Sequence, residues 1–249
     1  YHDSALTDNP EKDPILVRPL GYNKDNPYGL QIHKYDNTQP ETLEYLTRIR
    51  KVLDKYDAIS VGEIVSENPL DVVGEYANDQ RLHMAYCFEF LSEDFNFLNT
   101  NKIVDQFFHN NPNSWPCWSF SNHDSMRIAS RVTKPSKEIM KKLLELKGNI
   151  CIYQGEELGL QETEVQFEDL QDPFGKNFWT EFKGRDGCRT PMPWNSNEIN
   201  LGFSEKKTWL PVNHDYAPKS VEQQKQNPDS MLNYTKQLIK QRKRGFATQ

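Results

Sequence analysis

Two acidic side chains of this 249-residue chain stand directly after strand-like runs, where general acid–base chemistry is often located. Glu63 follows the apolar run 58–62, and Asp124 closes the segment 118–124, which begins apolar and ends polar. In barrels of parallel strands, functional side chains collect at the carboxyl ends of the strands. Paired carboxylates and many aromatic residues suit sugar chemistry, so the residues alone indicate an α/β enzyme and favour a glycosidase.

Glu63 is the candidate general acid. Because side chains alternate along a strand, Ile59, Val61 and Glu63 share one face of the run. The other residues of the stretch 61–65 are apolar, so we expect the Glu63 carboxyl to be partly desolvated, as a general acid working near neutral pH requires. The competing interpretation is a structural glutamate after a short strand.

Three consecutive polar side chains, Asn122, His123 and Asp124, end the second run. An apolar strand that ends in three polar residues is typical of a segment that faces a cleft. A histidine between an asparagine and an aspartate can equally be a hydrogen-bonded turn residue, and both interpretations stay open at this point.

The elements that must position these residues alternate between strand and helix about every 25–35 residues, which indicates a parallel sheet built of βαβ units. Residues 1–40 predict a long ordered loop with a turn at 25–29, and the stretch after 153 is irregular up to a final amphipathic helix. Four strands are predicted, half the number in a (β/α)₈ barrel. The expected strands are 58–62, 84–90, 117–121 and 149–153, and the expected helices are 40–56, 69–78, 97–109, 136–147 and a stretch from about 229.

Charge and composition exclude several classes of protein. The net charge of −6 argues against a general nucleic-acid binder, which needs a basic surface. The chain has no apolar run long enough to predict a membrane span. The spacing of the cysteines fits no zinc or redox motif, so free and mostly buried thiols in a reducing compartment are expected. These cysteines are Cys87, Cys117, Cys151 and Cys188.

Several motifs in a fixed order resemble one enzyme family. The sequence is similar to the α-glucosidase branch of the α-amylase superfamily, glycoside hydrolase family 13. The resemblance implies the second half of a (β/α)₈ TIM barrel, about strands five to eight. The segments that carry it are 61–63 (VGE), 81–84 (RLHM), 115–118 (WPCW), 121–124 (SNHD), 153–159 (YQGEELG) and 184–192 (GRDGCRTPM).

The resemblance also implies roles for single residues. Glu63 corresponds to the acid/base that protonates the glycosidic oxygen and then deprotonates the incoming water or sugar hydroxyl. Asp124 corresponds to the carboxylate that holds ring hydroxyls and stabilises the oxocarbenium-like transition state. Arg189 and the pair 156–157 can equally serve only to hold their loop. The implied substrate-binding residues are Asn122, His123, Arg185 and Arg189.

One expected motif does not occur in the sequence. Family members are retaining enzymes that need a second carboxyl as nucleophile, an Asp in a Gly-Phe-Arg-x-Asp type of motif after strand four. The segment 1–3 resembles residues just past that Asp, so strands one to four and the nucleophile are expected upstream. We therefore expect the isolated chain to be inactive. The expected layout is a loop and helix over 1–57, strands five to eight over 58–155, and a loop and terminal helix over 156–249.

The implied whole protein is a retaining α-glucosidase that releases terminal α-linked glucose from small oligosaccharides or α-glucosides, with transglucosylation open as a second reaction. No cofactor is expected, no metal ligand is predicted in this chain, and neither nucleic acid nor membrane is an expected partner. The expected partner is the missing amino-terminal barrel half, and the expected location is cytoplasmic. Two alternative interpretations stay open. The first is a non-enzymatic relative that serves as an interaction or transporter-accessory domain. The second is a soluble α/β domain left over from a truncated gene. The choice between α-1,4 and α-1,6 bonds stays open.

Overall fold

The computed structural model describes residues 5–10, 31–64, 66, 68–91 and 95–247. It divides into two compact units, the first made of 1–119 with 146–151 and the second of 120–145 with 152–249. The turn predicted at 25–29, most of the long amino-terminal loop and the segment 1–3 lie outside the described residues.

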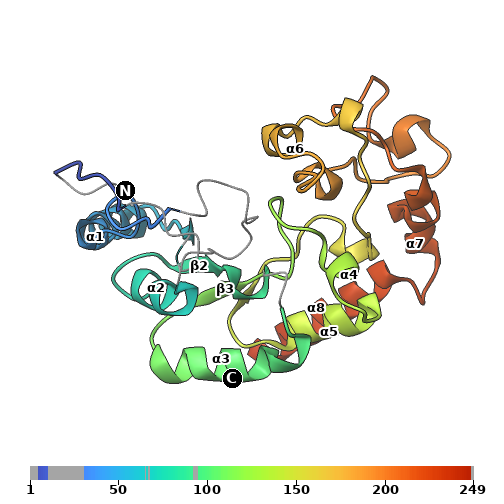
Figure 1. Cartoon of the computed structure of the whole chain (residues 1–249). Helices are drawn as coiled ribbons and strands as arrows, with labels where there is room; N and C mark the ends of the chain where they lie inside the picture. Colours follow the sequence, from blue (N-terminus) through green and yellow to red (C-terminus); the bar gives the residue numbers. More distant parts are fainter. Residues whose placement is uncertain (1–4, 11–30, 65, 67, 92–94, 248–249) are drawn as a thin grey trace. The chain divides into compact units, whose positions relative to one another are not determined.

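A parallel sheet forms the centre of the first unit (Figure 1). Its strands pair in chain order, and every pair is parallel. The predicted four parallel strands are confirmed, although each is shorter than its pattern indicates. The strands are β1 (Val61–Glu63), β2 (Met84–Cys87), β3 (Pro116–Trp118) and β4 (Asn149–Ile150).

One face of the sheet is buried beneath helices α2 (Pro69–Tyr76) and α3 (Thr100–Asn110), which lie on the same side of it (Figure 1). Trp118 on this face is fully buried, with its ring centroid 5.0 Å from that of Phe90 and 5.5 Å from that of Phe107. Its indole Nε1 donates to the Lys147 carbonyl oxygen at 2.6 Å, so the polar atom of this buried ring is satisfied. The turns η2 (Phe88–Leu91) and η3 (Phe97–Asn99) complete this layer.

Helix α1 (Pro40–Lys55) begins with Pro40 in its first turn, as predicted. The leucines of its apolar pattern are half-buried, whereas Ile49 is 46% exposed and Tyr56, just beyond the helix, is 78% exposed. Tyr45 and Val52 are also more than half exposed. Helical spacing places these exposed side chains along one stripe, so α1 carries an apolar surface that the described residues leave open.

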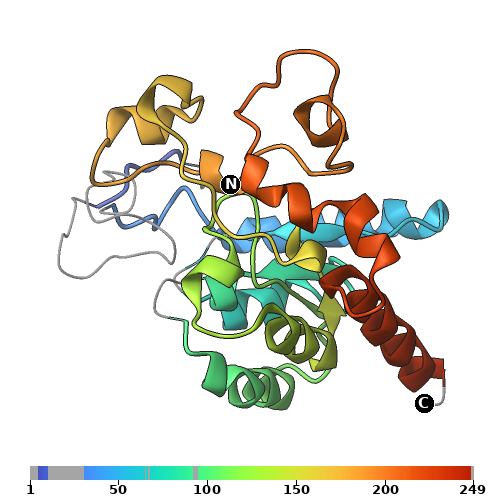
Figure 2. The same cartoon turned by 90° about the vertical axis from the view of Figure 1, so that its right-hand side faces the viewer.

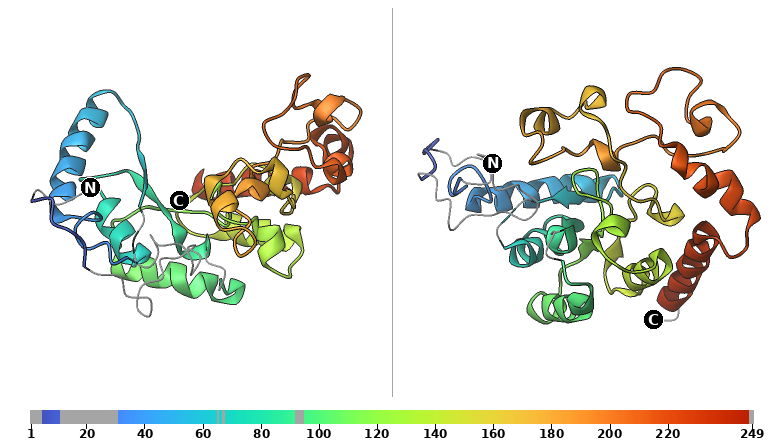
Figure 3. Two further views of the ribbon diagram at one scale, coloured as in Figure 1. Left: turned by 45° about the horizontal axis from the view of Figure 1, so that its top comes forward. Right: turned by 45° about the vertical axis from the view of Figure 1, so that its right-hand side comes forward.

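The second unit packs helices against a long irregular segment. Helix α5 (Ser136–Glu145) lies beside α8 (Met231–Ala247), in agreement with the predicted amphipathic patterns (Figure 2). Residues 153–220 run as loops with short helical turns until α7 (Val221–Gln226) (Figure 3). The remaining elements of this unit are α4 (Ile128–Arg131), η4 (Glu156–Leu158), η5 (Phe167–Asp169), α6 (Pro173–Asn177), η6 (Asp186–Cys188), η7 (Ile199–Gly202) and η8 (His214–Lys219).

The irregular segment is ordered because it has its own apolar core. Seven buried side chains from separate loops and helices pack together there. Burying apolar area in this way offsets the conformational entropy that a long loop loses on ordering. The members of this core are Leu158, Leu160, Met192, Leu201, Tyr216, Val221 and Leu232.

Candidate active site

The turn that carries Asp124 is held by local hydrogen bonds after β3. The Ser121 hydroxyl, which is buried, accepts from the Ile128 backbone N–H at 2.9 Å. The Asn122 side-chain oxygen accepts from the Asp124 N–H at 2.9 Å. The turn therefore presents His123 and Asp124 at the surface, with 58% and 38% of their side chains exposed and His123 Nε2 3.6 Å from Asp124 Oδ2.

Two arginines from a distant loop converge on Asp124. Arg185 Nη1 donates to Asp124 Oδ1 at 3.0 Å, and Arg189 Nη2 donates to the same oxygen at 2.8 Å. Arg189 also donates from Nε to the His123 carbonyl oxygen at 2.6 Å. The structure thus brings together the predicted site residues of the second unit. Arg189 contacts both the backbone of the turn and the Asp124 carboxylate, so substrate binding and loop holding both stay predictions for it.

Behind Arg185 lies Asp172, a residue that the sequence motifs did not single out. Its side chain is fully buried, and it accepts from Arg185 Nε and from Arg185 Nη2, each at 2.8 Å. Burial by itself raises the pKa of Asp172, but the hydrogen bonds from Arg185 and from backbone N–H groups outweigh it and lower that pKa overall. The same pairing raises the pKa of the Arg185 guanidinium.

Arg127 is a second residue that the sequence did not reveal, and it ties together the segments around the site. It is buried, and it donates from Nη1 to the Gln154 carbonyl oxygen at 2.7 Å and from Nη2 to the Cys188 carbonyl oxygen at 2.8 Å. Its backbone N–H donates to Glu162 at 2.9 Å. Burial raises the pKa of Glu162, and the contacts with Arg127 only partly oppose this. One side chain therefore fixes the loops that carry Asp124 and Arg189.

The acidic pair after β4 serves the local turn. Glu156 accepts from the Tyr153 N–H at 2.9 Å, and Glu157 accepts from the Gly155 N–H at 2.7 Å. Gly155 has a positive φ of 96°, a conformation that favours glycine. These contacts support the loop-holding interpretation of the pair.

Glu63 belongs to the first unit, at the end of β1. From Ile59 to Glu63 alternate side chains are exposed, so Ile59, Val61 and Glu63 do share one face. The expected desolvation of Glu63 is wrong for this chain, because Val61 is 49% exposed and Glu63 is exposed as well. The physical reason is that β1 is the edge of the described sheet and pairs only with β2 within it.

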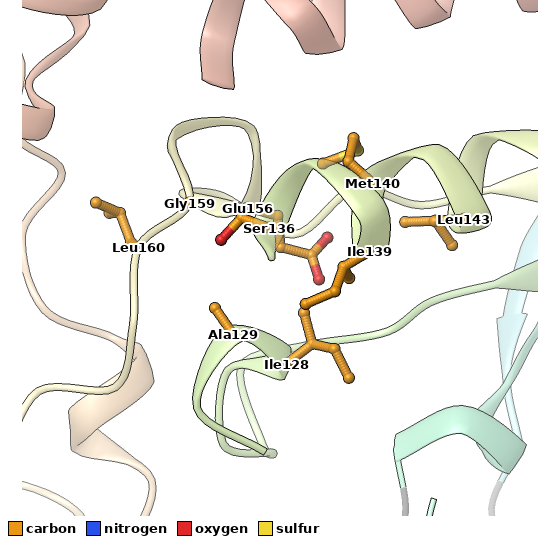
Figure 4. Close-up of a pocket in the computed structure, with 9 residues that line it drawn as sticks. All are labelled: Ile128, Ala129, Ser136, Ile139, Met140, Leu143, Glu156, Gly159 and Leu160. Atoms are coloured by element: carbon orange, nitrogen blue, oxygen red, sulfur yellow. The ribbon is translucent and has the colours of Figure 1, made fainter. Parts of the chain in front are cut away.

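The small cavity in Figure 4 lies between α4, α5 and residues 156–160, with the Glu156 carboxyl among mainly apolar side chains. Its volume of about 10 Å³ is close to the smallest space that holds one water molecule, so it is a packing gap rather than a sugar site. Its lining residues are Ile128, Ala129, Ser136, Ile139, Met140, Leu143, Glu156, Gly159 and Leu160.

The described parts of the chain hold neither a disulfide bond nor a metal-binding cluster. The four cysteines are free; three are buried and Cys151 is half-buried, as predicted. No group of three or more His, Cys, Asp or Glu side chains in those parts is arranged to hold a metal ion. None of the described helices combines the length and apolarity that crossing a membrane requires.

A family model described as alpha amylase, catalytic domain, matches residues 3–248. The chain belongs to the α-amylase family. Its four parallel strands with covering helices are therefore part of a (β/α) barrel, and the resemblance of the motifs to this family is confirmed.

Several curated relatives are named as glucosidases. A protein of Rhizobium meliloti (strain 1021) described as "Probable alpha-glucosidase" is 42% identical over 98% of this chain and 46% of its own length. An "Oligo-1,6-glucosidase" of Heyndrickxia coagulans is 29% identical over 86% of this chain and 46% of its own length. The chain thus spans a little under half the length of the curated relatives that it matches.

Solved structures agree with this placement. The crystal structure of the alpha-glucosyl transfer enzyme XgtA matches with a TM-score of 0.89 and 43% identity, covering 97% of this chain and 46% of the other. The trehalose-6-phosphate hydrolase TreA of Bacillus licheniformis matches with a TM-score of 0.76 and 28% identity, covering 85% of this chain and 45% of the other.

Proposed function

We propose that this chain supplies the acid/base half of a retaining α-glucosidase barrel that releases terminal α-linked glucose from small oligosaccharides or α-glucosides. The observation that carries the proposal is the convergence of Arg185 and Arg189 on Asp124, which is exposed beside His123. An exposed carboxylate held by two guanidinium groups suits the binding of sugar hydroxyls, because carboxylates accept and guanidinium groups donate with fixed geometry.

In the proposed reaction Glu63 protonates the glycosidic oxygen while a nucleophilic carboxylate from the amino-terminal half attacks the anomeric carbon. Glu63 then takes a proton from water, which releases glucose from the glycosyl-enzyme. Asp124, His123 and Asn122 hold the ring hydroxyls, and Arg185 and Arg189 orient Asp124. A sugar hydroxyl in place of water would give transglucosylation, which the name of the XgtA relative supports.

The proposed layout places the loop and helix after strand four in 1–57, strands five to eight in 58–155, and the following loop and terminal helix in 156–249. The partner is the amino-terminal barrel half. Two features of the first unit support this partner. Among the described residues β1 pairs only with β2, and its Val61 is 49% exposed. The apolar stripe of α1 is exposed as well. Parallel strands in barrels are normally covered on both faces, so these surfaces fit a second half.

The deciding experiment compares the isolated chain with a complete barrel, in which this chain follows the amino-terminal half of the Rhizobium meliloti relative. We expect the isolated chain to dimerise or aggregate in light scattering and to leave 4-nitrophenyl α-glucoside intact. We expect the complete barrel to hydrolyse it, and Glu63→Gln to lower kcat at least about 1000-fold. Turnover by the isolated chain, freed of host enzyme, would contradict the proposal.

A further inference from the structure

Asp172 and Arg185 form a fork of two parallel hydrogen bonds inside the second unit. Arg185 Nε reaches Asp172 Oδ2 and Arg185 Nη2 reaches Asp172 Oδ1, both at 2.8 Å. A guanidinium group is planar, so two such bonds fix both its position and the orientation of its plane. Nη1 is the nitrogen that this fork does not use, and it donates to Asp124.

Asp172 is itself held rigidly. Its backbone N–H donates to the buried Asp186 carboxylate at 2.8 Å, and the neighbouring Gln171 N–H donates to the same oxygen at 2.6 Å. Asp172 also caps α6 by accepting from the Phe174 N–H at 3.1 Å. The carboxylate therefore cannot follow a displaced arginine without breaking several other bonds.

The backbone is closely packed around the Asp172 side of the fork, whereas the Arg185 side chain is 27% exposed. A Cβ built on Gly175 would lie 2.7 Å from the Lys183 carbonyl oxygen, and one built on Gly184 would lie 2.8 Å from the Gly175 Cα. Only glycine allows α6 to approach the loop before Arg185 this closely. The Arg185 guanidinium also stacks over the Phe174 ring, 5.1 Å from its centroid.

We propose that Asp172 is a positioning residue: it holds the Arg185 guanidinium so that Nη1 faces Asp124 and the sugar site. The expected effect on catalysis rests on the proposed function. The hydrogen bonds between Asp172 and Arg185 do not depend on that function. Asp172 is fully buried, so it acts on the substrate only through Arg185. Its replacement is therefore expected to weaken catalysis only while Arg185 is present.

The first test uses the complete barrel and does not depend on its activity. In ¹⁵N NMR, the Arg185 Nε–H signal, assigned by its loss in Arg185→Lys, is expected to exchange slowly with solvent. Asp172→Asn, which keeps the size of the side chain but removes its charge and one acceptor, is expected to accelerate this exchange about 10-fold or more. The matched control is Asp169→Asn, three residues away at an exposed position, which should leave the signal unchanged.

The second test is a double-mutant cycle in the complete barrel with 4-nitrophenyl α-glucoside. Asp172→Asn should lower kcat/KM about 10- to 100-fold in the presence of Arg185 and less than about 2-fold in an Arg185→Ala background. Equal losses in both backgrounds would overturn the inference, because they would show a general structural role. Unchanged exchange in Asp172→Asn would overturn it too. If the complete barrel is inactive while Asp172→Asn accelerates the exchange of the Arg185 Nε–H, the proposed function is contradicted but the positioning of Arg185 by Asp172 is supported.

Discussion

Arg189 and Asp124 are joined by a hydrogen bond of 2.8 Å between Nη2 and Oδ1, although 65 residues separate them. The same arginine holds the His123 carbonyl oxygen, so one side chain fixes both the turn and its carboxylate. The pair is partly exposed, with 19% of the Arg189 side chain and 38% of the Asp124 side chain accessible. A contact of this kind contributes little to stability, which leaves positioning as its main effect.

Asp124→Asn separates these two effects. Since exposed ion pairs contribute at most about 1 kcal/mol, we expect the free energy of unfolding of the complete barrel to change by no more than that. In the complete barrel we expect kcat/KM to fall at least about 1000-fold, because in the proposed reaction the Asp124 charge stabilises the transition state. Urea unfolding and steady-state kinetics measure the two quantities. Asp229→Asn, an exposed position in the same unit, is the control, and an equal loss of activity there would refute this role of Asp124.

Gly184→Ala is expected to destabilise the second unit by about 2–3 kcal/mol. The residue has a positive φ of 82°, and a Cβ there would lie 2.8 Å from the Gly175 Cα, so conformation and packing both oppose a side chain. Gly245→Ala is the matched control, since a Cβ there meets nothing within 4 Å and the residue is helical. Alanine is favoured in helices, so this control should be neutral or stabilising by up to about 1 kcal/mol. Thermal unfolding followed by circular dichroism compares the two, and equal shifts would contradict the prediction.

Trp118→Phe is expected to lower the free energy of unfolding of the first unit by about 2–3 kcal/mol. The substitution keeps an aromatic ring between Phe90 and Phe107 but leaves a gap and removes the donor to the Lys147 carbonyl oxygen.

Trp115→Phe provides the control for this substitution, since Trp115 is 40% exposed and should lose less than about 1 kcal/mol. Urea unfolding followed by far-ultraviolet circular dichroism avoids reliance on the removed fluorophore. A smaller loss at Trp118 than at Trp115 would show that the buried indole is not central to this layer.

Cys151 is expected to be the cysteine that iodoacetamide modifies first. A hydrogen bond with Cys117 lowers the pKa of Cys151, and one with Tyr86, whose Oη lies 3.5 Å from Sγ, adds to this against the opposing effect of burial. Burial raises the pKa of Cys87 and of Cys188 to about 12. The thiolate is the reactive form, so Cys151 should react already below pH 7, with its rate levelling off as pH rises through its lowered pKa.

Mass spectrometry of the alkylated peptides against pH measures this order. Tyr86→Phe removes one stabilising partner and should move the Cys151 profile to higher pH, whereas Cys87 and Cys188 should react only after unfolding. A Cys151 profile centred at the ordinary thiol value of about 8.5 would contradict the assignment.

The alternating strands and helices follow from local sequence. Pro40 opens α1 because proline fits a first helical turn, and the apolar spacing of 136–147 is realised as α5. The parallel pairing follows from strands separated by helices, since such connections return each strand in the same direction. Motif residues such as Asp124 and Arg185 could be named in advance for the same reason, because each lies in a short contiguous pattern.

The contacts between the residues of the site could not be predicted from local sequence patterns. Asp172 lies 13 residues from Arg185, and Arg127 lies 61 residues from the Cys188 carbonyl that it holds, so neither pairing leaves a periodic signal. The exposure of Glu63 also depends on what lies beside β1 rather than on its apolar neighbours in sequence. The sequence by itself determined the elements and the family, because these depend on local patterns. Only the tertiary structure decided which groups bind one another, because burial and hydrogen bonding depend on segments that the fold brings together.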